Sequence, residues 1–365
     1  MKIATVIGAR PQFIKAAIVS SHIKRKDEIN EIIIHTGQHY DKNMSDVFFD
    51  ELNIPVPSYN LNIGSATHGK QTGRMIEAIE KILFEEHPDK VLLYGDTNST
   101  LAGAIAASKL NIKIAHVEAG MRSFNKTIPE EINRIITDRV SDILFCPTTA
   151  AVENLKNEGM RKGVYLVGDV MYDSILYFDK ISDVKTELHK KLNLNEKDAM
   201  EKYILVTIHR QENTDCIENL SSILNAMSQI KEEIVLPLHP RTKKTIEKEK
   251  LSYKENIKII EPVSYREMLS LEKNAHMILT DSGGVQKEAF IFNVPCITFR
   301  EETEWVETVE NGMNKLTGAS TNKILDAYDN FSGNRENLHS DAGKVYGNGK
   351  SASKIIDILL NNHKN

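Results

Sequence analysis

Cysteine is scarce in this chain, with three among 365 residues, and no two of them form a CxxC motif. Cys146, Cys216 and Cys296 are expected to be reduced thiols, as is usual in a cytoplasmic protein. The scattered cysteines therefore exclude a disulfide framework and a cysteine-based zinc site.

Long apolar runs are also missing, since no window approaches the roughly 18 apolar residues of a membrane span. The apolar stretch at the N-terminus is too short for a signal peptide and leads into Gly-Ala-Arg-Pro, so it predicts a first strand. The formal net charge of −5 lacks the basic excess of a nucleic-acid binder. We expect a soluble, cytoplasmic protein that binds neither membranes nor nucleic acid.

No GxGxxG motif follows the first predicted strand, which argues against nicotinamide-dependent redox chemistry. We expect neither a metal nor an organic cofactor.

Short β-branched runs alternate with longer amphipathic stretches, which is typical of a parallel sheet covered on both faces. This pattern predicts an α/β fold of two Rossmann-like domains, residues 1–168 and 169–349, with a C-terminal helix over 350–365. The predicted strands are residues 2–7, 31–36, 90–94, 112–117, 143–146 and 164–167, then 203–207, 233–238, 257–260, 277–280 and 296–298. The predicted helices are residues 13–24, 69–85, 99–110, 130–140 and about 171–194, then 217–229, 242–250, 265–273 and 284–292.

The string GARPQFIK follows the first predicted strand. Gly8 allows a sharp turn, and Pro11 suits the first turn of a helix. The helix N-terminus can attract an anion, with Arg10 and Lys15 adding positive charge. An ordinary turn with solvated charges explains the string equally well.

Three carboxylates stand at strand ends or helix starts of the first domain: Asp96 in GDTNST, Glu118 in HVEAGMRS and Glu130 in PEEINR. Asp96 could be a helix N-cap, and Glu130 could serve only the helix dipole. Glu118 ends a buried strand, a costly place for a carboxylate that is neither paired nor used. Carboxylates crowded in one site have pKa values that move apart, which suits acid and base roles.

The second domain carries TIHRQEN, with His209 and Arg210, and His239-Pro240-Arg241 after the next strand. Its most specific string is TDSGGVQKEA, residues 280–289. There Ser282, Gly283 and Gly284 lead into a helix and expose backbone N–H groups suited to a diphosphate. Glu288 lies about one turn further along, within reach of ribose hydroxyls.

Together these strings resemble the non-hydrolysing UDP-N-acetylglucosamine 2-epimerase family, in order from Gly8 to Ala289. The resemblance implies a glycosyltransferase-B-like fold with a deep interdomain cleft, a C-terminal helix returning to the first domain, and a homodimer. It implies a UDP-sugar substrate whose diphosphate meets Ser282, Gly283 and Gly284. The ribose would meet Glu288, and the base the region of Glu261 and Tyr265. The other implied substrate-binding positions are Arg10, Lys15, Arg210, His239, Arg241 and Arg300.

The resemblance also implies the reaction, in which a base removes the C2 proton while UDP departs in an anti elimination. UDP then adds back to 2-acetamidoglucal after reprotonation on the opposite face. Asp96, Glu118 and Glu130 match the acid and base positions of the family, and His209 matches its site histidine. Which carboxylate serves which face stays open.

Two departures concern the substrate. The opening reads GARPQF where the enzymes acting on plain UDP-N-acetylglucosamine usually have GTRPE, and Trp305 stands where they have arginine. Both features look more like relatives acting on UDP-2,3-diacetamido-2,3-dideoxyglucuronate, although we keep the plain substrate first. A hydrolysing 2-epimerase, a glycosyltransferase of the same fold and a non-enzymatic UDP-sugar sensor are the remaining alternatives.

Overall fold

The computed structural model describes residues 1–38, 54–181 and 203–363. The chain divides into two compact units, one formed by Met1–Tyr177 with Gly343–Asn365, the other by Phe178–Ala342. The sequence placed the first boundary at residue 168 and the second at residue 349.

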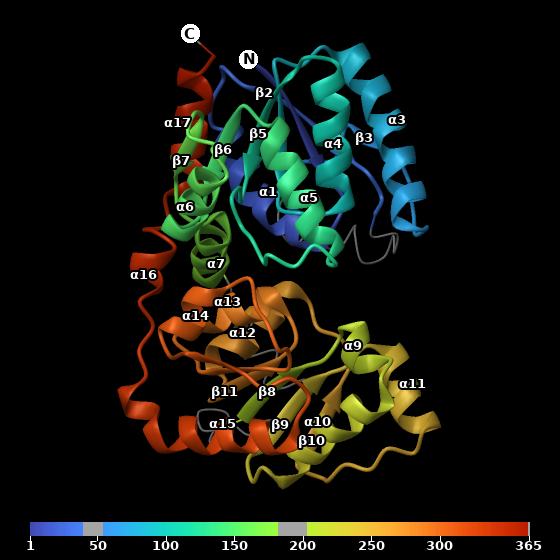
Figure 1. Cartoon of the computed structure of the whole chain (residues 1–365), viewed down its shortest axis with the longest axis vertical. Helices are drawn as coiled ribbons and strands as arrows, with labels where there is room; N and C mark the ends of the chain where they lie inside the picture. The colour runs from blue at the N-terminus through green and yellow to red at the C-terminus, as the bar shows by residue number, and fades with distance from the viewer. Residues whose placement is uncertain (39–53, 182–202, 364–365) are drawn as a thin grey trace. The chain divides into compact units, whose positions relative to one another are not determined.

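The first unit is built on a seven-stranded parallel sheet with the order β3-β2-β1-β4-β5-β6-β7 (Figure 1). Its central strands are buried along nearly their whole length, which explains their continuous apolar sequences. The bounds are β1 (Lys2–Ile7), β2 (Asn30–His35), β3 (Tyr59–Asn60), β4 (Lys90–Tyr94), β5 (Lys113–Val117), β6 (Ile143–Cys146) and β7 (Val164–Leu166).

Helices cover both faces of this sheet. They are α1 (Arg10–Ile23), α3 (His68–Glu86), α4 (Asn98–Lys109), α5 (Pro129–Val140), α6 (Thr149–Asn157), α7 (Val170–Ile181) and α17 (Ser351–Asn361). α3, α4 and α5 pack side by side in one layer, while α1 packs with α17 (Figure 1). The predicted helix over about 171–194 is α7 as far as Ile181, and its remainder lies outside the described residues.

The C-terminal segment is fixed to the first unit by hydrogen bonds at the start of α7. The N–H of Asp169 donates to the carbonyl of Tyr346, and the carboxylate of Asp173 accepts from the N–H of Ala352 at 2.8 Å. Asp173 therefore supplies an acceptor for the first turn of α17, whose own N-cap, Lys350, offers none.

The second unit contains a six-stranded parallel sheet, β10-β9-β8-β11-β12-β13. The strands are β8 (Tyr203–Thr207), β9 (Glu233–Pro237), β10 (Ile257–Ile260), β11 (Met277–Thr280), β12 (Cys296–Thr298) and β13 (Asn314–Leu316). The helices are α9 (Gln211–Thr214), α10 (Ile217–Gln229), α11 (Pro240–Lys248), α12 (Tyr265–Asn274), α13 (Gly283–Ile291), α14 (Val306–Glu310) and α15 (Thr321–Asn334), then η1 (Arg335–Asn337). α16 (Ala342–Val345) begins at the last residue of this unit and continues in the first unit.

Two parallel sheets flanked by helices confirm the predicted α/β class. Among the described residues, no helix combines the length and the apolarity needed to cross a bilayer.

A half-buried carboxyl on β2, that of Glu31, gives the fold a pH dependence. Glu31 accepts hydrogen bonds from Thr5 (2.5 Å) and Ser20 (3.0 Å), yet burial outweighs both and raises the pKa of Glu31 above its usual value. A carboxyl whose pKa is raised on folding costs no stability below its unfolded pKa. It lowers the free energy of unfolding progressively as the pH rises towards the folded pKa.

We therefore expect Glu31→Gln to raise the thermal midpoint at pH 7 by about 2 °C. The gain should vanish at about pH 3, well below the unfolded pKa of 4.5, where the wild-type carboxyl is protonated in both states. Calorimetry at the two pH values measures this, with exposed Glu28→Gln as the matched control. An equal gain at both values would contradict a titration effect.

Candidate active site

Three of the predicted site segments follow neighbouring strands of the first sheet. Gly8 follows β1, Asp96 comes two residues after β4, and Glu118 directly follows β5. Since β1, β4 and β5 are adjacent and parallel, their carboxyl ends meet at one edge of the sheet.

Lys15 of α1 forms an ion pair with Glu118 at this edge. Both side chains are largely buried, with 9% and 12% of their surfaces exposed. A Cβ at Gly95 would lie 3.2 Å from the Glu118 carboxylate and 3.5 Å from the Lys15 ammonium. Gly95, with φ +61°, therefore lets the turn before Asp96 approach this pair closely.

Glu118 itself has a strained backbone, with φ +74°. Its N–H and that of Ala119 both donate to the carbonyl of Phe145 at 3.1 Å, which holds the turn in place. A non-glycine residue in the left-handed region costs on the order of 1 kcal/mol and tends to persist where side-chain placement matters. The strain thus supports a functional role for the Glu118 carboxylate.

Asp96 lies beside Arg134 of α5, with 2.5 Å between the carboxylate and the guanidinium. Burial raises the pKa of Asp96, as do the charges of Glu118 and Glu130, while Arg134 and Lys15 oppose the shift. Its side chain nevertheless keeps 31% of its surface exposed, so solvent or a ligand can reach it. A reachable carboxyl with a raised pKa is suited to holding and releasing a proton.

The purely structural roles considered for Asp96, as a helix N-cap, and for Glu130, as a partner of the helix dipole, have different outcomes. Asp96 is not the cap of the next helix, because the N-cap of α4 is Thr97, whose hydroxyl accepts from the N–H of Thr100. Glu130 lies exposed in the first turn of α5, where the helix dipole alone favours it. Its influence on the pKa of Asp96 places its charge within electrostatic reach of that carboxylate.

Several residues that the sequence analysis left unassigned hold this edge of the sheet. His116 of β5 contacts the Asp138 carboxylate through Nδ1 and the Gly95 carbonyl through Nε2, both at 2.7 Å. Asp138 also accepts from Arg122 and from the N–H of Gly120. Burial opposes ionisation of Asp138, but His116 and Arg122 hold its pKa below the usual value.

Glu131 and Arg134 form a second support on α5. Glu131 accepts from the N–H groups of Ser123 and Phe124 and from Arg134 at 3.0 Å, so Arg134 bridges two carboxylates, those of Glu131 and Asp96. The sequence signal that could have identified Arg134 is the position of a charged residue on the buried face of a helix.

In the second unit, Asp281 organises the loop that follows β8. Its fully buried carboxylate accepts from the backbone N–H groups of His209 and Arg210 and from the side chain of Asn213, at 3.0–3.1 Å. It also pairs with the His209 ring at 3.1 Å. Burial opposes ionisation, but these contacts hold the pKa of Asp281 below its usual value. The His209 side chain remains 56% exposed and available to a ligand.

The helix α13 begins directly after this carboxylate. Ser282 is its N-cap and accepts from the N–H of Val285. In the Cβ direction of Gly284 there is open space, with nothing nearer than the Ser282 hydroxyl at 3.8 Å. Further along, Glu288 is buried and accepts from the Tyr265 hydroxyl at 3.1 Å. Ser282, Gly284, Glu288 and Tyr265 are thus held along one helix and its neighbour.

In the second unit, the remaining predicted binding residues lie around α11 and α12 or at the end of β12. His239 is the N-cap of α11 and, with Arg241, lines a pocket of about 500 Å³. Arg241 pairs with exposed Asp215, and Glu261 is exposed near Lys243 at 3.8 Å.

Arg300, after β12, is buried and pairs with Glu304 at 2.9 Å. Arg10 is the first residue of α1 in the first unit. No group of three or more His, Cys, Asp or Glu suited to a metal ion occurs in the described parts of the chain.

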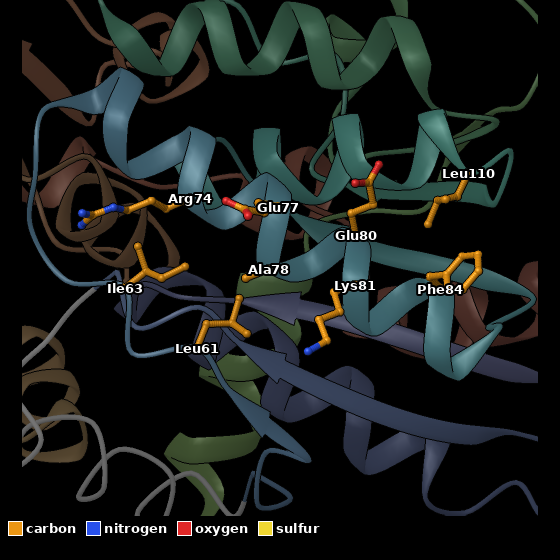
Figure 2. Close-up of a pocket in the computed structure, with 9 residues that line it drawn as sticks. All are labelled: Leu61, Ile63, Arg74, Glu77, Ala78, Glu80, Lys81, Phe84 and Leu110. Atoms are coloured by element: carbon orange, nitrogen blue, oxygen red, sulfur yellow. The ribbon is translucent and has the colours of Figure 1, made fainter.

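A second pocket, of about 700 Å³, lies along α3 (Figure 2). Charged and apolar side chains of α3 and apolar side chains from neighbouring segments share its lining: Leu61, Ile63, Arg74, Glu77, Ala78, Glu80, Lys81, Phe84 and Leu110. None of these is a predicted site residue, so this pocket does not enter the assignment of the substrate site.

Comparison with known proteins links the geometry to a family. The family profile described as UDP-N-acetylglucosamine 2-epimerase matches residues 21–360. A "UDP-N-acetylglucosamine 2-epimerase homolog" of Methanococcus maripaludis is 56% identical, over 99% of this chain and all of its own. The UDP-2,3-diacetamido-2,3-dideoxy-D-glucuronate 2-epimerase of Pseudomonas aeruginosa is 51% identical, over 98% of this chain and 99% of its own.

Among solved structures, the UDP-GlcNAc 2-epimerase of Methanocaldococcus jannaschii in complex with UDP-GlcNAc and UDP is similar to this chain. The TM-score is 0.87 and the identity 45%, with 99% of each chain covered.

Proposed function

The chain belongs to the UDP-N-acetylglucosamine 2-epimerase family, and on that premise we propose that it is a non-hydrolysing epimerase interconverting UDP-GlcNAc and UDP-ManNAc. The observation that carries the proposal is the grouping of Asp96 and Glu118 with Lys15 and Arg134 at one sheet edge. Such a group supplies more than one proton-transfer residue, whereas a glycosyltransferase needs one base and a groove for an acceptor.

The reaction chemistry explains why both acid–base groups and an anion site are needed. The C2 proton of an N-acetylhexosamine has no adjacent carbonyl and is therefore not acidic. A base takes this proton, its C–H electron pair forms the C1=C2 bond, and the C1–O bond breaks so that UDP leaves with its electrons. Protonation of 2-acetamidoglucal on the opposite face of C2, with re-addition of UDP oxygen to C1, completes the inversion.

Within the first unit, we assign proton transfer to Asp96 and Glu118, with Glu130 adjusting the local charge. The raised pKa of Asp96 keeps its protonated form accessible, while the Lys15 ammonium beside Glu118 favours a carboxylate there. Because the reaction is reversible, the two groups exchange acid and base roles between the two directions.

Within the second unit, we assign the departing UDP to the start of α13 and to the loop held by Asp281. N–H groups at a helix N-terminus stabilise a diphosphate as its negative charge grows. Arg210 follows β8 on the same loop and adds positive charge, the His209 ring lies beside it, and Glu288 with Tyr265 is suited to the nucleoside.

A second candidate substrate, UDP-2,3-diacetamido-2,3-dideoxyglucuronate, is favoured by the GARPQF opening, by Trp305 and by a comparison of identities. The relative named for that substrate is 51% identical to this chain, against 46% for the UDP-N-acetylglucosamine 2-epimerase of M. jannaschii. The C2 chemistry is the same for both sugars, so the catalytic assignment does not change.

Proton NMR in D2O with each UDP-sugar tests the proposal. We expect deuterium at C2 of UDP-GlcNAc, with UDP-ManNAc accumulating and no stoichiometric release of free sugar. Release of free N-acetylmannosamine with UDP would establish a hydrolysing enzyme instead. Exchange only with the diacetamido-glucuronate would transfer the assignment to the second candidate, and exchange with neither would refute it.

We also propose a cytoplasmic homodimer, on the basis of the family resemblance and of three thiols that form no disulfide. Light scattering after size exclusion should give twice the 41.2 kDa of one chain. Fractionation of source cells tests the location.

A further inference from the structure

Trp305 is the one tryptophan in the sequence, and it lies against the first turn of α13. Its side chain is buried, with 6% exposed, and its indole nitrogen lies 3.5 Å from where a Cβ on Gly283 would stand. Glu304, paired with Arg300, approaches the same point to 2.4 Å. The Gly283 side of the turn is therefore closely packed, while the Gly284 side is open.

Lys287 places a positive charge against the ring of Trp305. It belongs to α13 itself, is 2% exposed, and its ammonium lies 4.0 Å from the centroid of the Trp305 ring. A desolvated ammonium over an indole face interacts more strongly than an exposed one. The contact therefore ties the helix to the segment that carries Trp305.

We infer that Lys287 and Trp305 are a pair of positioning residues for the diphosphate turn at Ser282–Gly284. The indole fixes the backbone at Gly283, and the ammonium adds positive charge to the helix whose N–H groups bind the diphosphate. This inference rests on the proposed function, because it takes the start of α13 as the UDP site. Neither side chain is assigned a contact with substrate.

Four variants separate the charge from the ring: Lys287→Met, Lys287→Arg, Trp305→Leu and Trp305→Phe. Titration calorimetry with UDP should show Kd raised roughly tenfold in Lys287→Met and Trp305→Leu. The conservative variants Lys287→Arg and Trp305→Phe should recover most of the affinity. KM for the UDP-sugar should rise with Kd, whereas kcat should change less, because the proton-transfer groups are untouched.

Lys315→Met is the matched control, since Lys315 makes the same type of contact with a different ring, that of Phe331 in α15, at 5.5 Å in the same unit. It should leave UDP binding unchanged. Fluorescence excited at 295 nm reports on Trp305 alone, and its emission should change both on Lys287→Met and on adding UDP to wild type.

The outcomes distinguish this inference from the proposed function. If wild type binds no UDP, the proposed function fails. A different result is that wild type binds UDP while Lys287→Met and Trp305→Leu lower the thermal midpoint and keep the wild-type Kd. If, in addition, UDP leaves the Trp305 emission of wild type unchanged, the pair is merely structural and the inference is wrong.

Discussion

Asp96→Asn should lower the rate of epimerisation by about 10²–10⁴-fold while leaving the affinity for UDP nearly unchanged. The amide keeps the shape of the carboxylate and remains beside Arg134, so the turn after β4 should keep its geometry. What it loses is the ability to take up and release a proton. The expected split between catalysis and binding follows because UDP is assigned to the second unit.

Deuterium exchange at C2 and calorimetry with UDP measure the two effects in one preparation. Asp357→Asn on the exposed side of α17 is the matched control and should retain full activity. If Asp96→Asn kept more than about a tenth of wild-type exchange, Asp96 would have no place in proton transfer.

The family and the fold class were within reach of the sequence, and both predictions are confirmed. Strands such as β4 and β8 read as short continuous apolar runs because both faces of a central parallel strand are buried. Several elements were not predicted: β3, α6, α9, β13, α14, α15, η1 and α16. β13 has three residues, too few for a periodic pattern, and α15 extends over 321–334 between polar loops.

The site was only partly predictable for a related reason. Asp96 and Glu118 are prominent because each follows a buried strand, but their proximity depends on β4 lying beside β5. Strand order is set by non-local pairing that no local string encodes. Arg134 was overlooked because a charged residue within a helix usually faces solvent, and its buried position emerges only when α5 packs beside α4.

Trp305 illustrates what packing adds to a substitution noticed in the sequence. The sequence suggested that tryptophan at this position removes a cation. In the structure, Lys287 brings an ammonium to the indole from a different element. The packing of α13 against the segment before α14, which the sequence does not show, thus places a positive charge beside Trp305.

Asp281→Asn should destabilise the protein by about 3 kcal/mol at pH 7 and weaken UDP binding more than tenfold. The carboxylate accepts from three donors besides the His209 ring, and an amide can replace only part of this. Displacement of His209 and Arg210 would follow, which is why affinity should fall together with stability.

The pH dependence identifies the cause of the loss. The pKa of Asp281 is lowered on folding, so its contribution is complete above the unfolded value, near 3.8, and disappears as the pH falls through the folded value. Denaturant unfolding should thus show the full gap between wild type and Asp281→Asn at pH 7, closing below pH 3.8. Asp215→Asn, which breaks only the exposed pair with Arg241, should cost less than about 1 kcal/mol. A gap for Asp281→Asn that stayed constant down to the lowest pH would mean that shape, rather than charge, makes this aspartate necessary.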